Sequence, residues 1–329
     1  MRNRFFAGLL TAALVDPDLV LITADLGFGA VDEFAAARPG QFVNAGVAEQ
    51  NMAGLAAGMA LAGARVFTYS IANFPTLRCL EQIRNDICYH HADVTVVAVG
   101  GGLAYGALGM SHHATEDLAI MRALPGMAVA APGDPAEVDA VLADLLAGGG
   151  PAYLRLGKTG ERRIHGGGVS APRGASIPLG TGGEVLLCCT GAILDAACDA
   201  AESLARDGIA ADVRSFPWLD PFDAAAVREA AGRYAALVTV EEHSIVGGLG
   251  SAVAEVLAEA GAGMPLLRIA LPAQSSSVVG DQQYLRTAFE LDAGSISRRV
   301  RTHLAAHPAA THPAPADPEG NRGLASQIR

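Results

Sequence analysis

The sequence predicts an α/β protein built from two doubly wound units with largely parallel sheets. Short apolar stretches alternate with amphipathic or small-residue stretches of helical length, which is the pattern of strands joined by crossover helices. The alternation stops in a Gly- and Pro-rich segment and then resumes, which indicates two units. A length of 329 residues is also more than one ordinary core needs.

The first unit is expected to cover residues 1–160. Residues 1–7 have the basic start of a signal peptide, but Asp16 and Asp18 arrive before an adequate apolar region, so a helix is expected instead. Residues 94–99 contain a single polar side chain and should form a central strand. The expected strands are 19–23, 42–44, 65–69, 94–99, 129–130 and 152–156, and the expected helices are 49–62, 75–90, 115–124 and 135–146.

Residues 161–183 are expected to link the two units, because they are rich in Gly and Pro and lack apolar periodicity. The second unit is expected at residues 184–306. The segment 307–329 is rich in Pro, Ala and polar residues and is expected to be a disordered tail. In the second unit the expected strands are 185–189, 211–215, 237–240 and 266–269, and the expected helices are 194–207, 223–231 and 249–260.

The composition excludes several classes of function. A net charge of −11 argues against a general nucleic-acid or anionic-membrane surface, so neither is expected as a partner. No uninterrupted apolar stretch reaches the roughly 18 residues of a membrane span. The five cysteines include no C-x-x-C pair, which suits reduced thiols in a cytoplasm.

The segment from Gly46 to Met52 places one acid, Glu49, at the start of an almost uncharged, small-residue helix. The charged form of a carboxyl buried among such residues is disfavoured, and a carboxyl that can hold a proton near neutral pH suits acid–base work on a bound cofactor. The alternative is an acid stabilised by the helix dipole. Glu49 is therefore the first candidate catalytic residue.

Four segments occur in an order and spacing that are more informative than any of them alone. The chain that contains them resembles the C-terminal half of transketolases over nearly its whole length. It also resembles the β subunits of 2-oxoacid dehydrogenase decarboxylating components and, more distantly, deoxyxylulose-phosphate synthase. The resemblance implies a thiamine-diphosphate pyrimidine-binding domain followed by a transketolase C-terminal domain. The segments are 25–27, 46–52, 111–117 and 240–243, the last leading to the Gly-rich turn 247–250.

The resemblance implies that Glu49 hydrogen-bonds the ring nitrogen of the cofactor's aminopyrimidine and shares a proton there. It further implies an aromatic side chain stacked on that ring. Phe74, in a loop beside a proline, is the best placed, whereas Phe67 and Tyr69 lie at strand spacing and are favoured as core residues. Asp25, directly after the first strand, is the remaining candidate for cofactor binding.

For substrate binding, the resemblance implies that His112 faces the substrate hydroxyls and the reacting carbon. His113 is the next candidate, although His112 could equally form a helix-start pair with an acid. A His-His pair could bind a metal, but no third ligand sits at a telling spacing, so no metal site is expected. Arg155 and Lys158 are candidates for a substrate phosphate, with a domain-edge ion pair as the alternative for Arg155.

Two other motifs have open readings. Glu242 and His243 follow a buried strand and could line an interface near the active site, but a capped loop explains them equally well. The turn at 247–250 lacks the third glycine and the later acid of a dinucleotide-binding loop, so that function is given little weight.

One motif of the family is missing. No segment resembles the Gly-Asp-Gly…Asn signature that holds magnesium and the diphosphate. The implication is a split enzyme in which a subunit resembling the N-terminal part of transketolase supplies that half of the site. Mg²⁺ (or Ca²⁺) would be held mainly by this partner, in an α2β2 heterotetramer.

The favoured function is therefore transfer of a two-carbon ketol unit from a ketose to an aldehyde or carrier-bound acceptor. The loop 100–110 lacks the His and Asp expected of a sugar-phosphate enzyme, which leaves the donor open. The alternatives are a 2-oxoacid dehydrogenase β subunit, disfavoured by segment 111–116, and a non-catalytic scaffold. Retention of Glu49 argues against the scaffold, because a buried acid is costly.

Overall fold

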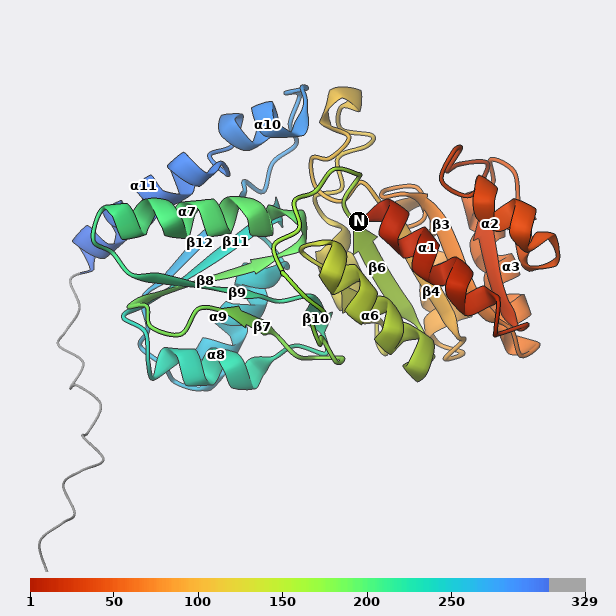
Figure 1. The fold of residues 1–329 in the computed structure, drawn as a ribbon, viewed down its shortest axis with the longest axis horizontal. Coiled ribbons are helices and arrows are strands. Elements are labelled where there is room, and N and C mark those ends of the chain that lie inside the picture. The colour runs from red at the N-terminus through yellow and green to blue at the C-terminus, as the bar shows by residue number, and fades with distance from the viewer. Residues whose placement is uncertain (308–329) are drawn as a thin grey trace, which may run out of the picture.

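The structure of the chain is a computed structural model, and it describes residues 1–307. The predicted α/β class is confirmed, because a seven-stranded and a five-stranded sheet, each mostly parallel, are covered by helices. Figure 1 shows the two sheets side by side. Within residues 1–307 every helix is too short or too polar to span a bilayer. The tail predicted at 307–329 lies, apart from its first residue, outside the described residues.

The larger sheet contains β1 (Leu19–Thr23), β2 (Phe42–Asn44), β3 (Arg65–Ile71), β4 (Val94–Val99), β5 (Ala128–Ala130), β6 (Ala152–Leu156) and, from later in the chain, β10 (Trp218–Asp220). Its strand order is β10-β5-β6-β4-β3-β1-β2, and only β10 runs antiparallel. All six residues of β4 are buried, as expected of an apolar central strand. Its helices are α1 (Arg2–Ala13), α2 (Asp32–Ala37), α3 (Glu49–Leu61), α4 (Leu80–Gln82), α5 (Asp117–Arg122) and α6 (Pro135–Gly148).

The helix predicted at 75–90 is instead three short helical pieces. A 3₁₀ turn at Leu77–Cys79 precedes α4, and a π-helical turn covers Ile83–Cys88. Helical spacing of the apolar residues is retained through the segment, so the sequence pattern alone did not reveal the breaks. The irregular start places Arg78 beside the first residue of α3, and π-helical turns are often found near functional sites.

The smaller sheet contains β7 (Ile177–Leu179), β8 (Val185–Thr190), β9 (Ala211–Ser215), β11 (Ala236–Ser244) and β12 (Leu266–Leu271), in the order β12-β11-β8-β9-β7. Strand β7 lies within the predicted linker and pairs antiparallel with β9 at the sheet edge. Its central Pro178 is tolerated there because an edge strand does not need every N–H. The helices are α7 (Leu194–Arg206), α8 (Ala224–Ala231), α9 (Leu249–Glu259), α10 (Gln282–Ala288) and α11 (Ala293–Ala306).

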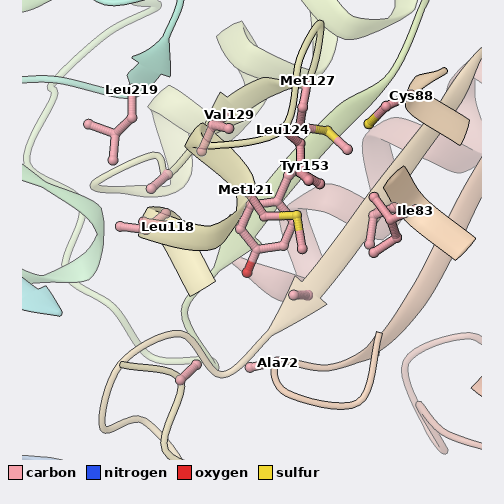
Figure 2. Close-up of a cluster of buried hydrophobic side chains, with 14 of the residues drawn as sticks. Ala72, Ile83, Cys88, Leu118, Met121, Leu124, Met127, Val129, Tyr153 and Leu219 are labelled. Atoms are coloured by element: carbon pink, nitrogen blue, oxygen red, sulfur yellow. The ribbon is translucent and has the colours of Figure 1, made fainter. Parts of the chain in front are cut away.

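Strand β10 joins the two units. It follows β9 in sequence but pairs with β5 in the larger sheet. The indole N–H of Trp218 donates to the carbonyl of Ala171 at 3.0 Å, and the ring is buried. The next residue, Leu219, belongs to a hydrophobic cluster that also contains Val129 and Tyr153 of the larger sheet (Figure 2). Burial of apolar surface therefore holds the two units against each other.

Replacing Trp218 with alanine is expected to lower the free energy of unfolding by about 3–5 kcal/mol, because it leaves a cavity at the junction and an unpaired buried carbonyl. Urea unfolding followed by circular dichroism measures the change. Val15→Ala, at an exposed position, should change the free energy of unfolding by less than about 0.5 kcal/mol. Equal, small changes in both variants would show that β10 does not couple the units.

Candidate functional site

Glu49 is the first residue of α3, directly after β2 and the positive-φ turn at Gly46. Its side chain is only 4% exposed, and its Oε2 accepts a hydrogen bond from Arg78 Nη1 at 2.7 Å. The sequence predicted nearly uncharged surroundings for Glu49. The structure adds one cation to them, because Arg78, 29 positions further along the chain, contacts the carboxylate. No described residue donates to Glu49 Oε1, so this oxygen can accept or share a proton with a ligand.

Aromatic and cationic side chains continue from this pair in one row. The Arg78 guanidinium lies 4.5 Å from the centre of the Phe74 ring, and Phe74 meets His112 edge-on with ring centres 5.2 Å apart. His112 in turn faces Tyr105 at 6.5 Å, and Lys158 Nζ lies 5.2 Å from the Tyr105 ring centre. Four predicted site residues, Glu49, Phe74, His112 and Lys158, are therefore brought into one connected row.

Sequence reasoning missed Arg78 and Tyr105, which complete this row. A signal for Arg78 was present, because it follows Phe74 by four residues at the start of an expected helix, where i and i+4 side chains meet. Tyr105 stands in a Gly-rich loop whose path the sequence does not specify.

His112 is held at the site through the backbone of its neighbours. Asn73, which precedes Phe74, donates from Nδ2 to the carbonyl of His113 at 2.7 Å, and Ser111 Oγ lies 2.9 Å from His112 Nδ1. Partial burial, with His113 as the smaller cause, lowers the pKa of His112. A neutral imidazole is therefore favoured, which can accept or donate a hydrogen bond to a substrate hydroxyl.

Phe67 and Tyr69 do not reach this row. Both rings are buried in the core, where Phe67 packs against Phe5 with ring centres 6.2 Å apart and Tyr69 meets Phe6 at 4.8 Å. Their assignment to cofactor stacking is corrected to core packing, for the reason foreseen from their strand spacing. Phe74 is half-buried, and of the three predicted aromatic residues it is the one linked to Glu49, through Arg78.

Asp25 lies in the turn after β1, where its carboxylate is hydrogen-bonded. It has a left-handed backbone with φ of 54°, its N–H donates to Asn44 Oδ1 at 3.0 Å, and its Oδ1 accepts from Asn44 Nδ2 at 3.1 Å. This reciprocal pair joins the carboxyl ends of β1 and β2. Asp25 therefore shapes the edge of the sheet from which α3 begins.

Arg155 is buried, and the contacts of its guanidinium group lie inside the protein. Its Nε lies 3.1 Å from Asp117 Oδ2, and Nη2 donates to the carbonyls of Ala114 at 2.7 Å and Glu242 at 2.8 Å. These internal contacts favour the ion-pair alternative, and the phosphate contact of Arg155 stays a prediction. Lys158 is exposed and remains the basic candidate on this side of the molecule.

The side chain of His113 contacts the loop at 100–110. Its ring is buried, and Nε2 donates to the carbonyl of Gly106 at 3.0 Å. The ring also borders a cavity of about 380 Å³ between the units, lined in part by Glu116, Phe289 and residues 271–276. No Lys or Arg lines this cavity, so its chemistry does not suit a phosphate. The ring of His113 is thus hydrogen-bonded within the protein, and its role as a substrate-binding residue stays a prediction.

Glu241 and His243 stabilise the junction around α9. Glu241 accepts hydrogen bonds from the N–H groups of Leu249 and Gly250, and burial raises its pKa to about 7. Burial lowers the pKa of His243 to about 4, so the ring is neutral and its Nε2 accepts from Ala119 N–H at 3.3 Å. The capped-loop reading thus fits His243, whereas Glu242 faces the loop at 100–110.

Among the described residues one group of side chains has the composition of a metal site: Asp134, Glu137 and His165. Asp134 already accepts four backbone N–H groups, and Glu137 accepts from Gly133 N–H at 2.6 Å and pairs with His165 Nε2 at 2.9 Å. Their lone pairs are used in fastening the start of the linker to α6. The group therefore does not suit the magnesium that accompanies a diphosphate.

Both parts of the chain match family models. The transketolase pyrimidine-binding domain matches residues 1–161, and the transketolase C-terminal domain matches residues 175–296. The chain belongs to the transketolase family. The resemblance stated from the four sequence segments is therefore confirmed.

Several relatives in this family are separate subunits of comparable length. The 6-deoxy-6-sulfo-D-fructose transketolase subunit of Clostridium sp. (strain MSTE9) is 36% identical over 299 residues, or 91% of this chain and 92% of the relative. An apulose-4-phosphate transketolase subunit of Phocaeicola vulgatus is 35% identical over 260 residues, or 78% of this chain and 83% of the relative. A solved split-gene transketolase, an inactive β4 tetramer, is 35% identical with a TM-score of 0.83 and covers 93% of this chain and 98% of its own.

The pairing of His165 with Glu137, which fastens the linker to α6 in this transketolase-family chain, should depend on pH. The hydrogen bond to Glu137 raises the pKa of His165. A raised folded-state pKa stabilises the fold fully below the unfolded value of about 6.5, and that stabilisation is lost as pH rises through the folded value. The wild type should therefore exceed His165→Gln in free energy of unfolding by more at about pH 5.5 than at about pH 8.5. Denaturant titrations at the two pH values test this, and a constant difference contradicts it.

Proposed function

We propose that this chain is the C-terminal subunit of a split, thiamine-diphosphate-dependent transketolase that transfers a two-carbon ketol unit from a ketose donor to an aldehyde or carrier-bound acceptor. The observation that supports this most directly is the buried Glu49 with one free oxygen, linked through Arg78 to the half-buried ring of Phe74. Membership of the transketolase family and the length of the relatives agree with it.

The residues present fit the pyrimidine half of the cofactor. A buried carboxylate oxygen without a partner suits a protonated ring nitrogen, and Phe74 offers an aromatic face for stacking. When bound, thiamine diphosphate supplies the electron sink for cleavage of a ketose carbon–carbon bond. Glu49 would share a proton at the ring nitrogen, while Arg78 holds the other carboxylate oxygen and fixes its direction.

The substrate would meet His112 and Lys158 on the far side of Phe74. The neutral imidazole of His112 can hold a hydroxyl by a hydrogen bond and move a proton during cleavage. Lys158, at the exposed end of the row, offers a cation for an anionic substituent of the substrate. The sulfonate and phosphate in the names of the relatives' substrates are groups of this kind.

The diphosphate half of the site is assigned to a partner subunit with an N-terminal transketolase fold. Among the described residues the one cluster with the composition of a metal site, Asp134, Glu137 and His165, is already hydrogen-bonded within the protein. The related split-gene transketolase is inactive as a β4 tetramer. We therefore propose an α2β2 assembly of this chain with its partner.

The test is Glu49→Gln in the complex with the partner, thiamine diphosphate and Mg²⁺. Glutamine preserves size but cannot share a proton, so the rate of ketol transfer should fall at least about 100-fold, while cofactor affinity changes far less. 6-Deoxy-6-sulfo-D-fructose and apulose 4-phosphate serve as donors, with a short aldose phosphate as acceptor.

Glu33→Gln is the matched control, because it removes an exposed acid at the start of α2, outside the row of site residues. It should leave rate and affinity unchanged. An unaltered transfer rate in Glu49→Gln would remove Glu49 from the chemistry and with it the proposed function.

A further inference from the structure

The Gly-rich loop at 100–110 lies against the second unit. Gly102 has φ of +64°, and a Cβ there would sit 2.7 Å from the carbonyl oxygen of Glu242. A Cβ on Gly106 would sit 2.2 Å from Leu285 of α10. Figure 1 shows this loop, drawn in yellow, standing beside α10. The loop can approach Glu242 and Leu285 this closely because these two positions are glycines and have no side chains.

The side chain of Glu242 is the centre of this contact. It is buried, and its Oε1 accepts from the N–H of Leu103 at 2.7 Å and from Gln282 Nε2 at 2.9 Å. Its Oε2 accepts from Arg286 Nε at 3.1 Å and Nη2 at 2.9 Å. Four donors on one carboxylate give a satisfied buried charge, which is the condition for such a charge to be stable.

The donors of Glu242 are themselves fixed to the second unit. Arg286 also pairs with Asp195 at 3.1 Å and donates to the carbonyl of Ala192 at 2.9 Å. Gln282 is the first residue of α10. The position of Glu242 relative to α7 and α10 is therefore set by charge-assisted hydrogen bonds rather than by the loop that it contacts.

The C-terminal end of the loop, at Ala114, is also held close to Glu242. Gly102 and Ala114 pair through mutual backbone hydrogen bonds of 2.9 Å. Arg155 donates to both the carbonyl of Ala114 and that of Glu242. Residues 102–114 therefore form a closed loop whose base is fastened to Glu242, and His112 lies within it.

We propose that Glu242 is a positioning residue for ketol transfer: by holding Leu103 it sets the conformation of residues 102–114 and hence the place of His112. The inference rests on the proposed function for its effect on activity. It gives the C-terminal unit a definite task in the reaction, since Glu242, Gln282 and Arg286 all belong to that unit. Glu242 itself touches no substrate in this account.

Glu242→Gln in the assembled enzyme tests the proposal. Glutamine has one acceptor oxygen and an NH₂ group, so at least one of the donors of Leu103, Gln282 and Arg286 faces another donor. Losing a charge-assisted hydrogen bond corresponds to about a 10- to 100-fold effect. The KM for the ketose donor should rise by about that factor, while thiamine diphosphate affinity, which depends on Glu49, stays within about threefold.

A second readout does not depend on turnover. In hydrogen–deuterium exchange the amides of 103–114 should exchange at least about tenfold faster in Glu242→Gln, while those of α3 remain unchanged. If the wild type proves to have no transketolase activity, the proposed function fails, and the exchange result alone decides whether Glu242 holds the loop.

Glu137→Gln is the matched control, because Glu137 is another fully buried, hydrogen-bonded carboxylate, located at α6. It should lower stability without raising KM or loosening 103–114. If Glu242→Gln does not fold, Gln282→Met removes a single donor and should shift KM and exchange in the same direction by a smaller factor. Unchanged KM and unchanged exchange in the folded variant overturn the proposal.

Discussion

The buried guanidinium of Arg155 is the point on which the arrangement of the site depends. It extends from strand β6 and forms an ion pair with Asp117 of α5. It also donates hydrogen bonds to the carbonyl of Ala114 and to the carbonyl of Glu242 in the second unit. A buried charge is stable only when such partners are present, so the two units and the loop between them must adopt one mutual placement. The two hydrogen bonds from Arg155 Nη2 thus tie the base of the loop 102–114, which contains His112, to the second unit.

The second constraint is the incompleteness of the cofactor site. Glu49, Arg78 and Phe74 form a compact group at the start of α3, and each has a contact that fixes its orientation. The acidic residues near the linker are instead saturated by backbone N–H groups. The proposed pyrimidine site at Glu49, together with the saturation of this acidic cluster, agrees with the naming of relatives of this length as transketolase subunits.

Much of the fold could be predicted from sequence, because strands such as β4 and β8 are fully buried and contain a single threonine each among apolar residues, and the helices between them are periodic. The prediction missed β7 and β10, which have three residues each and gain their stability from pairing with distant strands. Glu49 and Phe74, which Arg78 links in the structure, could be chosen as candidates from their local sequence. The internal contacts of Arg155 could not be predicted, because the carbonyls that it binds lie 41 and 87 positions away, where no local motif can reveal them.

The central claim is that this chain supplies one half of a thiamine-diphosphate site. The most direct test is calorimetric titration of thiamine diphosphate with Mg²⁺ into this chain, into its partner, and into their mixture. The account predicts saturable binding, in a one-to-one ratio to this chain, by the mixture and none by this chain alone. Tight binding by this chain alone, or no binding by a mixture that forms a complex, would contradict it.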